Sequence, residues 1–261
     1  MYAVVSASCP SSQGRVGCNH PTMFPTMLPI SEDASLQRYP FRPATGKGDG
    51  YAGVRRRMVQ EQVAARGVRD ARVLAAMARV PRHLFVEEAL RERAYGDHAL
   101  PIGERQTVSQ PYIVGVMTEA LALTGGEKVL EIGTGTGYQT AILAEIAGRV
   151  CSIERIVTLV DRAWKVIAAL GYRNVVLHRA DGAYGWQDEA PFDAIIVTAG
   201  TPGIPPALVN QLKIGGRIVV PVGERDAQVL QKAVKNENGL SVTSLGPCLF
   251  VPLLGAAGFP E

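Results

Sequence analysis

Residues 133–137 read Gly-Thr-Gly-Thr-Gly, so three glycines stand at every second position directly after a short apolar run with one acid in it. The run at 128–132 predicts a buried strand, and the apolar spacing from 141 to 147 predicts a helix. A glycine turn between a strand and a helix lets backbone N–H groups approach a ligand closely, and it commonly holds a nucleotide-like ligand. The same pattern also occurs as a merely tight connection. The cofactor contacts predicted in this turn are Gly133, Thr134, Gly135 and Gly137.

Three acids are expected where successive strands end. Glu131 lies inside the end of the strand before the turn, and Glu154 ends a strand predicted at 150–154, about 20 residues further on. Asp181, followed by Gly182, closes a third strand predicted at 174–177. Taken singly, Glu154 reads equally well as a surface acid and Asp181 as a turn residue. Because ligands of open α/β sheets bind at the carboxyl ends of the strands, the three acids together with Gly182 predict a cofactor site.

Two phosphate-binding motifs do not fit the glycine turn. A dinucleotide fingerprint has the spacing G-x-G-x-x-G, but Tyr138 stands where its last glycine belongs. A triphosphate loop needs a Lys-Ser/Thr pair after its glycines, and this turn lacks one. The three acids instead suit S-adenosyl-L-methionine, which carries a positive sulfonium and no phosphate.

A second polar stretch, residues 105–112, precedes the cofactor motifs, and we expect it to be a loop. Ser109 suits the N-cap of a helix predicted at 113–123, with Pro111 in or near the first turn. That capping role leaves unexplained why Thr107, Ser109 and Gln110 cluster just before the cofactor strand.

The remaining pattern positions these motifs in a sheet. Strands and helices alternate from residue 128 to residue 222, and the nearly all-apolar strand at 192–199 is expected to be buried on both faces. Two alternating runs, 229–234 and 240–251, flank Asn-Glu-Asn-Gly and predict a β-hairpin. The predicted fold class is a three-layer α/β/α Rossmann-like architecture, with a mostly parallel sheet and an antiparallel C-terminal hairpin.

The region before residue 100 predicts two helices and little chemistry. Helical spacing begins at Val54 and ends near Gly67, and Asp70 suits the N-cap of a second helix that stops before Pro81. The arginine triplet at 55–57 is expected to form a solvated helix face. His83 and His98 have no partner at ligand or triad spacing, and we expect structural roles for both.

The composition of the chain argues against several classes of binding partner. The net charge of +3 on 261 residues is too small to indicate a nucleic-acid partner. No apolar run approaches the roughly 20 residues that a membrane span needs, and the first residues lack the pattern of a signal peptide. The four cysteines have no metal-ligand spacing, so we predict no metal site and reduced thiols. We therefore expect a cytoplasmic protein without a membrane partner, and a monomer.

Domain boundaries follow from the same composition. Residues 1–52 are rich in Ser, Pro, Gly and Thr and are predicted to be a flexible N-terminal extension. Residues 53–261 are predicted to form the domain, with a helical and substrate-loop part at 53–125 and a cofactor-binding sheet at 126–261.

The motifs in combination resemble one enzyme family, the protein-L-isoaspartate O-methyltransferases. The resemblance runs from about Arg55 to Leu254 and depends on residues 107–111 (Thr-Val-Ser-Gln-Pro), 130–140, 152–155, 181–182, 191–199 and 250–253. The cofactor motifs alone indicate only a class I methyltransferase. The segment at 107–111 is the diagnostic part.

The resemblance implies S-adenosyl-L-methionine as cofactor, and damaged proteins and peptides containing isoaspartate as substrates. The methyl group is transferred to the free carboxyl of an L-isoaspartyl residue, and the ester then closes to a succinimide whose hydrolysis restores some aspartate. The family's catalytic serine falls on Ser109, and Thr107, Val108 and Gln110 are expected to shape the same pocket.

Leu249 departs from the family pattern, because a basic residue is expected just before Phe250. Three alternatives remain open at this point. They are a class I methyltransferase acting on a small molecule or RNA, an NAD-dependent oxidoreductase, and a non-catalytic protein that keeps the cofactor fold.

Overall fold

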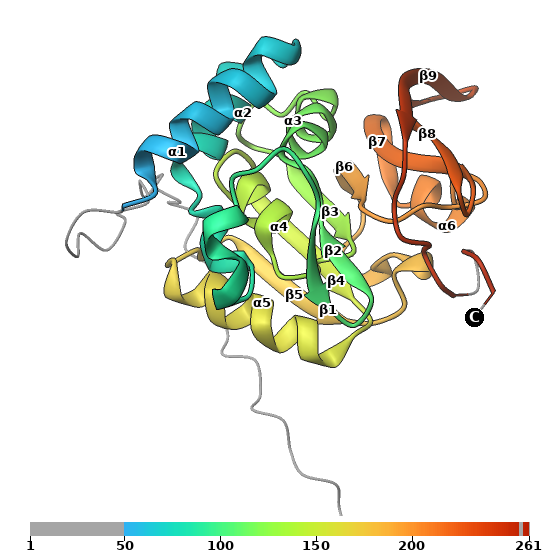
Figure 1. The fold of residues 1–261 in the computed structure, drawn as a ribbon. Coiled ribbons are helices and arrows are strands. Elements are labelled where there is room, and N and C mark those ends of the chain that lie inside the picture. Colours follow the sequence, from blue (N-terminus) through green and yellow to red (C-terminus); the bar gives the residue numbers. More distant parts are fainter. Residues whose placement is uncertain (1–49, 256–257, 261) are drawn as a thin grey trace, which may run out of the picture. The chain divides into compact units, whose positions relative to one another are not determined.

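A seven-stranded sheet carries the fold, with the strand order β5-β4-β3-β6-β7-β8-β9 (Figure 1). The structure is a computed structural model that describes residues 50–255 and 258–260. The flexible extension predicted at 1–52 lies outside the described residues, apart from Gly50, Tyr51 and Ala52.

The first five strands in this order run parallel, as predicted. β3 pairs in parallel with β4 on one side and with β6 on the other, and β5 and β7 extend the sheet outward. β8 and β9 add the antiparallel hairpin. The bounds are β3 Lys128–Ile132, β4 Arg149–Glu154, β5 Val175–Arg179, β6 Phe192–Val197, β7 Leu212–Glu224, β8 Ala227–Asn236 and β9 Gly239–Cys248.

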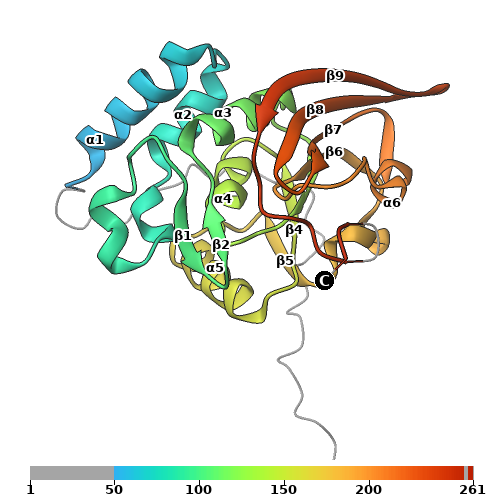
Figure 2. The same cartoon turned by 45° about the vertical axis from the view of Figure 1, so that its right-hand side comes forward.

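Helices cover both faces of the sheet. Val129 and its neighbours on one face pack in one core cluster with η1 and with α2 to α5, whereas Leu130 and Ile132 on the other face pack with α6 and the turns near Ala183. Figures 1 and 2 show α6 beside the C-terminal strands, on the side away from α1 and α2. The α-helices are α1 Ala52–Arg57, α2 Ala71–Arg79, α3 Pro111–Ala120, α4 Tyr138–Ala144, α5 Val157–Ala169 and α6 Pro206–Asn210.

The described residues also contain six 3-10 or π-helical segments, and they include a π-helical segment, η1, that sequence spacing did not predict. They are η1 Met58–Val63, η2 Ala64–Arg66, η3 Arg82–Phe85, η4 Glu88–Arg93, η5 Gly182–Tyr184 and η6 Gln187–Glu189. Among the helices of the described ranges, none combines the length and the apolar character that crossing a bilayer requires.

The prediction of a loop at 105–112 is partly wrong. β1 (Leu100–Gly103) and β2 (Gln106–Val108) form an antiparallel hairpin, and Glu104 and Arg105 turn the chain with φ angles of 52° and 57°. Leu100 and Val108 face each other in the register and are both buried, so apolar burial holds this polar stretch in place.

The predicted cap at Ser109 is also wrong. α3 begins at Pro111 itself, and the N-cap residue is Gln110, whose side chain makes no capping hydrogen bond. Proline suits the first helical position because its fixed φ angle is helical and its missing N–H would have no partner there. Ser109 therefore lies one residue before the cap and has no part in starting the helix.

The N-terminal helices agree with the predictions except at Arg55. Asp70 caps α2 by accepting a hydrogen bond from the N–H of Arg72. Arg56 and Arg57 are exposed, but Arg55 is buried and donates from Nε to the carbonyl oxygen of Ala78. The arginine triplet is thus only partly a solvated face.

Candidate active site

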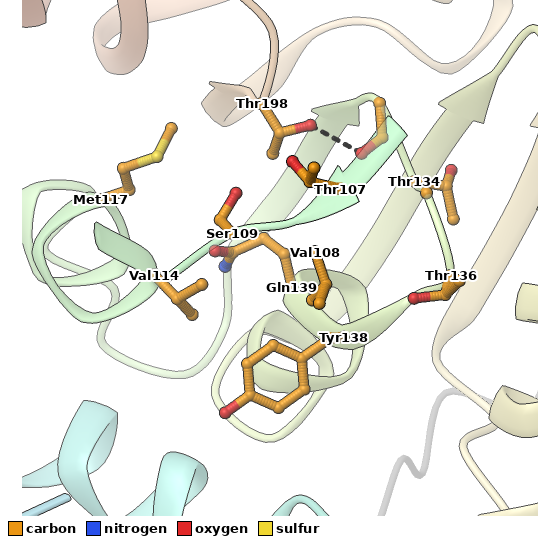
Figure 3. Close-up of a pocket in the computed structure, with 12 residues that line it drawn as sticks. Thr107, Val108, Ser109, Val114, Met117, Thr134, Thr136, Tyr138, Gln139 and Thr198 are labelled. Carbon is orange, nitrogen blue, oxygen red and sulfur yellow. Dashed lines mark hydrogen bonds between the residues drawn. The ribbon is translucent and has the colours of Figure 1, made fainter. Parts of the chain in front are cut away.

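The turn between β3 and α4 requires its glycines. Gly133, Gly135 and Gly137 have φ angles of 95°, 56° and 93°, a region that side chains with a Cβ rarely adopt. A Cβ at Gly133 would also lie 2.4 Å from Oγ1 of Thr198, at the end of the neighbouring strand β6. The Thr198 hydroxyl donates to the carbonyl oxygen of Gly133 at 2.7 Å, which fixes the start of the turn (Figure 3).

Most N–H groups of this turn are bound within the protein. The N–H groups of Gly133 and Thr134 donate to the carbonyl oxygen of Ile153, at 2.9 and 3.2 Å. The N–H of Gly135 donates to Oε2 of Glu154 at 2.9 Å. These N–H groups are therefore not free to cradle a phosphate, and the Glu154 carboxylate would repel one. The turn fits a ligand that carries no phosphate and has positive charge.

One pocket brings the glycine turn and the substrate stretch together. Figure 3 shows Ser109 and Thr107 on one side of it, with Thr134, Thr136 and Tyr138 on the turn and helix opposite. The lining residues are Thr107, Val108, Ser109, Val114, Met117, Gly133, Thr134, Gly135, Thr136, Tyr138, Gln139 and Thr198. Three of the four predicted substrate residues and three of the four predicted turn residues thus meet at one place.

Ser109 presents an unused hydroxyl to this pocket. The side chain is partly buried, and its Oγ makes no hydrogen bond to any of the described residues. The backbone of Ser109 is fixed, since its carbonyl oxygen accepts a 2.7 Å hydrogen bond from Arg82. A held backbone with a free hydroxyl is suited to donating a hydrogen bond to a ligand.

The pocket wall offers a second open hydroxyl and several apolar groups. Oγ1 of Thr136 is buried and has no hydrogen-bond partner among the described residues. A polar ligand in the pocket would supply that partner. Gln139 is held by Thr118, to which its amide donates at 3.0 Å. Val114 and Met117 of α3 supply apolar surface.

Glu131 lies behind the turn and outside the pocket wall. Its side chain is fully buried, and Oε2 accepts hydrogen bonds from Oγ1 of Thr140 at 2.5 Å and from Oγ of Ser152 at 2.6 Å. The Ser152 hydroxyl in turn lies 2.6 Å from Oγ1 of Thr134, a pocket residue. Burial raises the pKa of Glu131 to about 8, although both hydroxyls oppose this shift. The Ser152 hydroxyl thus links Glu131 to Thr134 in the pocket wall, and the predicted direct contact of Glu131 with the cofactor remains a prediction.

Glu154 is the last residue of β4, and Asp181 and Gly182 follow the end of β5; none of the three lines the pocket of Figure 3. Besides accepting from Gly135, Glu154 accepts a hydrogen bond from the N–H of Ile156 at 3.0 Å. Asp181 accepts one from the N–H of Ala183 at 2.9 Å and begins η5. A Cβ on Gly182 would lie 2.4 Å from Cγ2 of Ile132, so close packing requires this glycine. The three residues stand at the predicted strand ends, and their cofactor contacts remain predictions.

Gln110 faces away from the pocket. Its amide nitrogen donates to Oδ1 of Asp97 at 2.8 Å and to the Asp97 carbonyl oxygen at 3.2 Å. Arg66 donates to the same carboxylate at 3.1 Å and stacks over the ring of Tyr112. The predicted substrate contact of Gln110 stays a prediction that this geometry does not favour.

The C-terminal motif at 250–253 lies beside the end of β6. The N–H of Gly200 donates to the carbonyl oxygen of Val251, and the N–H of Leu253 to that of Gly200, both at 2.8 Å. Leu249, which replaces the expected basic residue, is 71% exposed. An apolar side chain therefore stands in solvent next to this edge of the sheet.

Several pocket residues were not predicted, and Thr198 had the clearest signal. It is a polar residue directly after the apolar strand at 192–197, at the carboxyl end next to the glycine turn. Tyr138 and Gln139 follow the turn and belong to the first turn of α4. Sequence spacing does not mark Val114 and Met117 as pocket residues, because apolar residues at helical spacing usually form the core.

Comparison with known proteins gives a consistent result. The model of the family "Protein-L-isoaspartate(D-aspartate) O-methyltransferase (PCMT)" matches residues 54–258. The protein-L-isoaspartate O-methyltransferase of Syntrophus aciditrophicus is 56% identical over 214 residues, which are 81% of this chain and 98% of that protein. The protein-L-isoaspartate O-methyltransferase 1 of Syntrophobacter fumaroxidans is 58% identical over 205 residues, 78% of this chain and 96% of that one.

Solved structures agree. One protein-L-isoaspartate O-methyltransferase matches with a TM-score of 0.70 at 29% identity, over 77% of this chain and 66% of that one. A beta-aspartate methyltransferase (PCMT) from Plasmodium falciparum, in complex with S-adenosyl-L-homocysteine, matches with a TM-score of 0.66 at 23% identity. That second likeness covers 77% of this chain and 98% of the other, and it shows the fold.

Proposed function

Since the chain belongs to the protein-L-isoaspartate(D-aspartate) O-methyltransferase family, we propose that its pocket methylates the free carboxylate of L-isoaspartyl residues in damaged proteins and peptides. The relatives at 56% and 58% identity carry that name, which supports isoaspartyl substrates over a small molecule or RNA. The ester formed in this way closes to a succinimide, and hydrolysis of the succinimide begins the repair.

The cofactor is S-adenosyl-L-methionine, and the described residues fit it. Bound there, it supplies a methyl group on a positively charged sulfur. The turn at Gly133, Thr134, Gly135 and Gly137 would hold it, with Glu154, Asp181 and Gly182 along the neighbouring strand ends and Glu131 acting from behind. The fit rests on the internally bound N–H groups of the turn and on the open Thr136 hydroxyl.

The observation that carries the substrate assignment is the free hydroxyl of Ser109 in the pocket of the glycine turn. A free carboxyl group has a pKa of roughly 4 and is ionised at pH 7, so it needs no general base before it reacts. Ser109 donates a hydrogen bond that orients this carboxylate. Thr107 and Val108 shape the same side of the pocket.

Apolar surface near Ser109 assists the reaction. A carboxylate and a sulfonium lose their charges when the methyl group is transferred, so an environment poor in water favours the transition state over the charged reactants. Val108 is buried, and Val114 and Met117 line the same pocket. These side chains keep water from the reacting groups, and alignment of the reacting atoms supplies the rest of the acceleration.

The proposal is tested by transfer of a labelled methyl group to an isoaspartyl peptide and to its aspartyl twin. The two peptides have the same composition and differ only in which carboxyl of the residue is free. We expect label in the isoaspartyl peptide alone. Equal labelling of both peptides, or of neither, would overturn the proposed function, and labelling of RNA instead would favour the alternative substrate class.

We further propose that the protein acts as a cytoplasmic monomer without a nucleic-acid partner, and that residues 53–125 and 126–261 divide into a substrate part and a cofactor part. The low net charge of +3 supports the absence of a nucleic-acid partner. Light scattering of the full chain, with and without added RNA, measures the oligomeric state and RNA binding. A dimer mass or a mass increase with RNA would contradict it.

A further inference from the structure

Arg82 has a fully buried guanidinium that joins separate segments of the chain. It is 0% exposed. Its Nε donates to the carbonyl oxygen of Ala94 at 2.7 Å, and its Nη2 donates to the carbonyl oxygen of Ser109, also at 2.7 Å. The planar fork thus fixes the backbone of Ser109 against the segment that follows η4.

The same side chain also contacts the helix that begins at the glycine turn. The guanidinium carbon lies 4.6 Å from the ring centre of Tyr138, in a cation–π arrangement. Tyr138 is the first residue of α4, directly after Gly137. Phe85 ends the same short helix, η3, that Arg82 begins. Its ring packs edge-on against the Tyr138 ring, with 5.6 Å between the two ring centres. Arg82 therefore contacts both Ser109, two residues before α3, and Tyr138, the residue after the cofactor turn.

Core packing alone does not explain why a charged guanidinium is buried at position 82. Burial lowers the pKa of Arg82, and no carboxylate among the described residues forms an ion pair with it. Its Nη1 has no hydrogen-bond partner there either. An uncompensated buried charge is costly, and an apolar side chain of similar volume would pack without that cost. What arginine adds is a rigid fork that binds two carbonyl oxygens while its face stacks on a ring.

We propose that Arg82 is a positioning residue that sets the distance between Ser109 and the turn that holds the methyl donor. This inference rests on the proposed function, because it assigns Ser109 to the substrate carboxylate. Displacing one reacting group by about 1 Å is enough to cost roughly 100-fold in rate. Arg82 touches neither reactant, and it acts through the Ser109 carbonyl and the Tyr138 ring.

The test compares Arg82→Lys and Arg82→Gln with Arg55→Lys. A lysine keeps the charge, but its single ammonium does not reproduce the planar fork, and a glutamine keeps one donor without charge. Arg55 is the matched control, because it too is buried and donates from Nε to a backbone carbonyl, but that carbonyl belongs to Ala78 of α2, whereas Arg82 binds the carbonyl of the pocket residue Ser109. We measure kcat and KM for the isoaspartyl peptide, the Kd of S-adenosyl-L-homocysteine and the melting temperature of each variant.

We expect both Arg82 variants to lose about 10- to 100-fold in kcat per S-adenosyl-L-homocysteine-binding site, with Kd changed less than about threefold. Arg55→Lys should keep kcat while its melting temperature falls. Three results would overturn the inference. These are unchanged kcat in both Arg82 variants, loss of ligand binding together with kcat in both Arg82 variants, and full activity in Arg82→Lys but not in Arg82→Gln. The second result would indicate general structural support, and the third would indicate charge alone.

Failure of the proposed function is recognised separately. Wild-type protein that does not distinguish the isoaspartyl peptide from its aspartyl twin would refute that function whatever the Arg82 variants do. Wild-type selectivity together with unchanged Arg82 variants would refute only the positioning role.

Discussion

The N–H of Gly135 donates a 2.9 Å hydrogen bond to Oε2 of Glu154, which ties the glycine turn after β3 to the end of β4. Oε1 of the same carboxylate accepts from the N–H of Ile156. Each carboxylate oxygen has further lone pairs, so Glu154 can shape the turn and still accept hydrogen bonds from a ligand. If Glu154 contacts the cofactor as we propose, a single acid couples the shape of the turn to recognition of the cofactor.

Replacing Glu154 by alanine should weaken cofactor binding more than it slows turnover. We expect a loss of about 1–3 kcal/mol in binding, the scale of a hydrogen bond to a charged group, with kcat at saturating cofactor nearly unchanged. Calorimetric titration with S-adenosyl-L-homocysteine measures the binding. Glu189→Ala is the control, since Glu189 forms a surface ion pair with Arg149 at 2.7 Å and does not line the pocket. An unchanged Kd in Glu154→Ala would contradict the assignment.

Ser109→Ala should show the opposite division. Removing the free hydroxyl deletes the donor that orients the substrate carboxylate, and we expect kcat to fall by about 10- to 100-fold with little change in cofactor Kd. Steady-state methyl transfer to an isoaspartyl peptide measures it. Ser244→Ala, at an exposed position of β9, serves as the matched control. If Ser109→Ala and Glu154→Ala had the same defect, the separate substrate and cofactor roles would be wrong.

Gly133→Ala should damage the site beyond its effect on the backbone. Alanine at a positive φ angle costs roughly 1–2 kcal/mol of stability wherever it stands. At Gly133 the added Cβ would also lie 2.4 Å from Oγ1 of Thr198, so the threonine must move and the pocket must change. Gly171→Ala isolates the backbone term, because Gly171 has a φ angle of 79° and open space around it. We expect the melting temperature of Gly133→Ala to be equal to or lower than that of Gly171→Ala. Cofactor binding should be weaker in Gly133→Ala alone. Equal binding by the two variants would contradict this.

The parallel sheet and the glycine turn were predictable because their signals are local. Apolar β-branched runs such as 192–197 form buried strands, and alternate glycines mark a turn that only glycine can make. The hairpin of β8 and β9 was predictable for the same reason, since turn residues separate two alternating runs.

The features that the sequence did not predict depend on backbone angles or on distant partners. The turn between β1 and β2 follows Gly103 and uses Glu104 and Arg105 at positive φ angles, which residues with a Cβ rarely adopt. Arg82 is polar by type, and only its contacts with Ala94, Ser109 and Tyr138 explain its burial. Gln110 turns away from the pocket because Asp97 accepts its amide. Sequence spacing does not contain these long-range contacts.

Stability should depend on pH through Glu131. Burial raises the pKa of Glu131 to about 8 in the folded protein, against 4.5 for an ordinary glutamate. Between these two values the folded chain keeps the proton and the unfolded chain releases it. The free energy of unfolding therefore falls as pH rises from about 5 to 8, by at most about 1.4 kcal/mol per pH unit, and levels off above 8.

Glu131→Gln removes this dependence, because glutamine mimics the neutral acid and does not titrate. Its amide oxygen can still accept from Thr140 and Ser152. Denaturant unfolding at pH 5, 6, 7 and 8 should show the variant gaining stability relative to wild type at each step.

Glu127→Gln is the control. Although burial alone raises its pKa, hydrogen bonds from Thr124 and Gly125 hold the pKa of Glu127 at about 2, so the carboxylate is ionised in both states above pH 5 and the difference from wild type should stay flat. A flat difference for Glu131→Gln would mean that the buried carboxylate is already ionised at pH 5, with the Thr140 and Ser152 hydroxyls outweighing its burial.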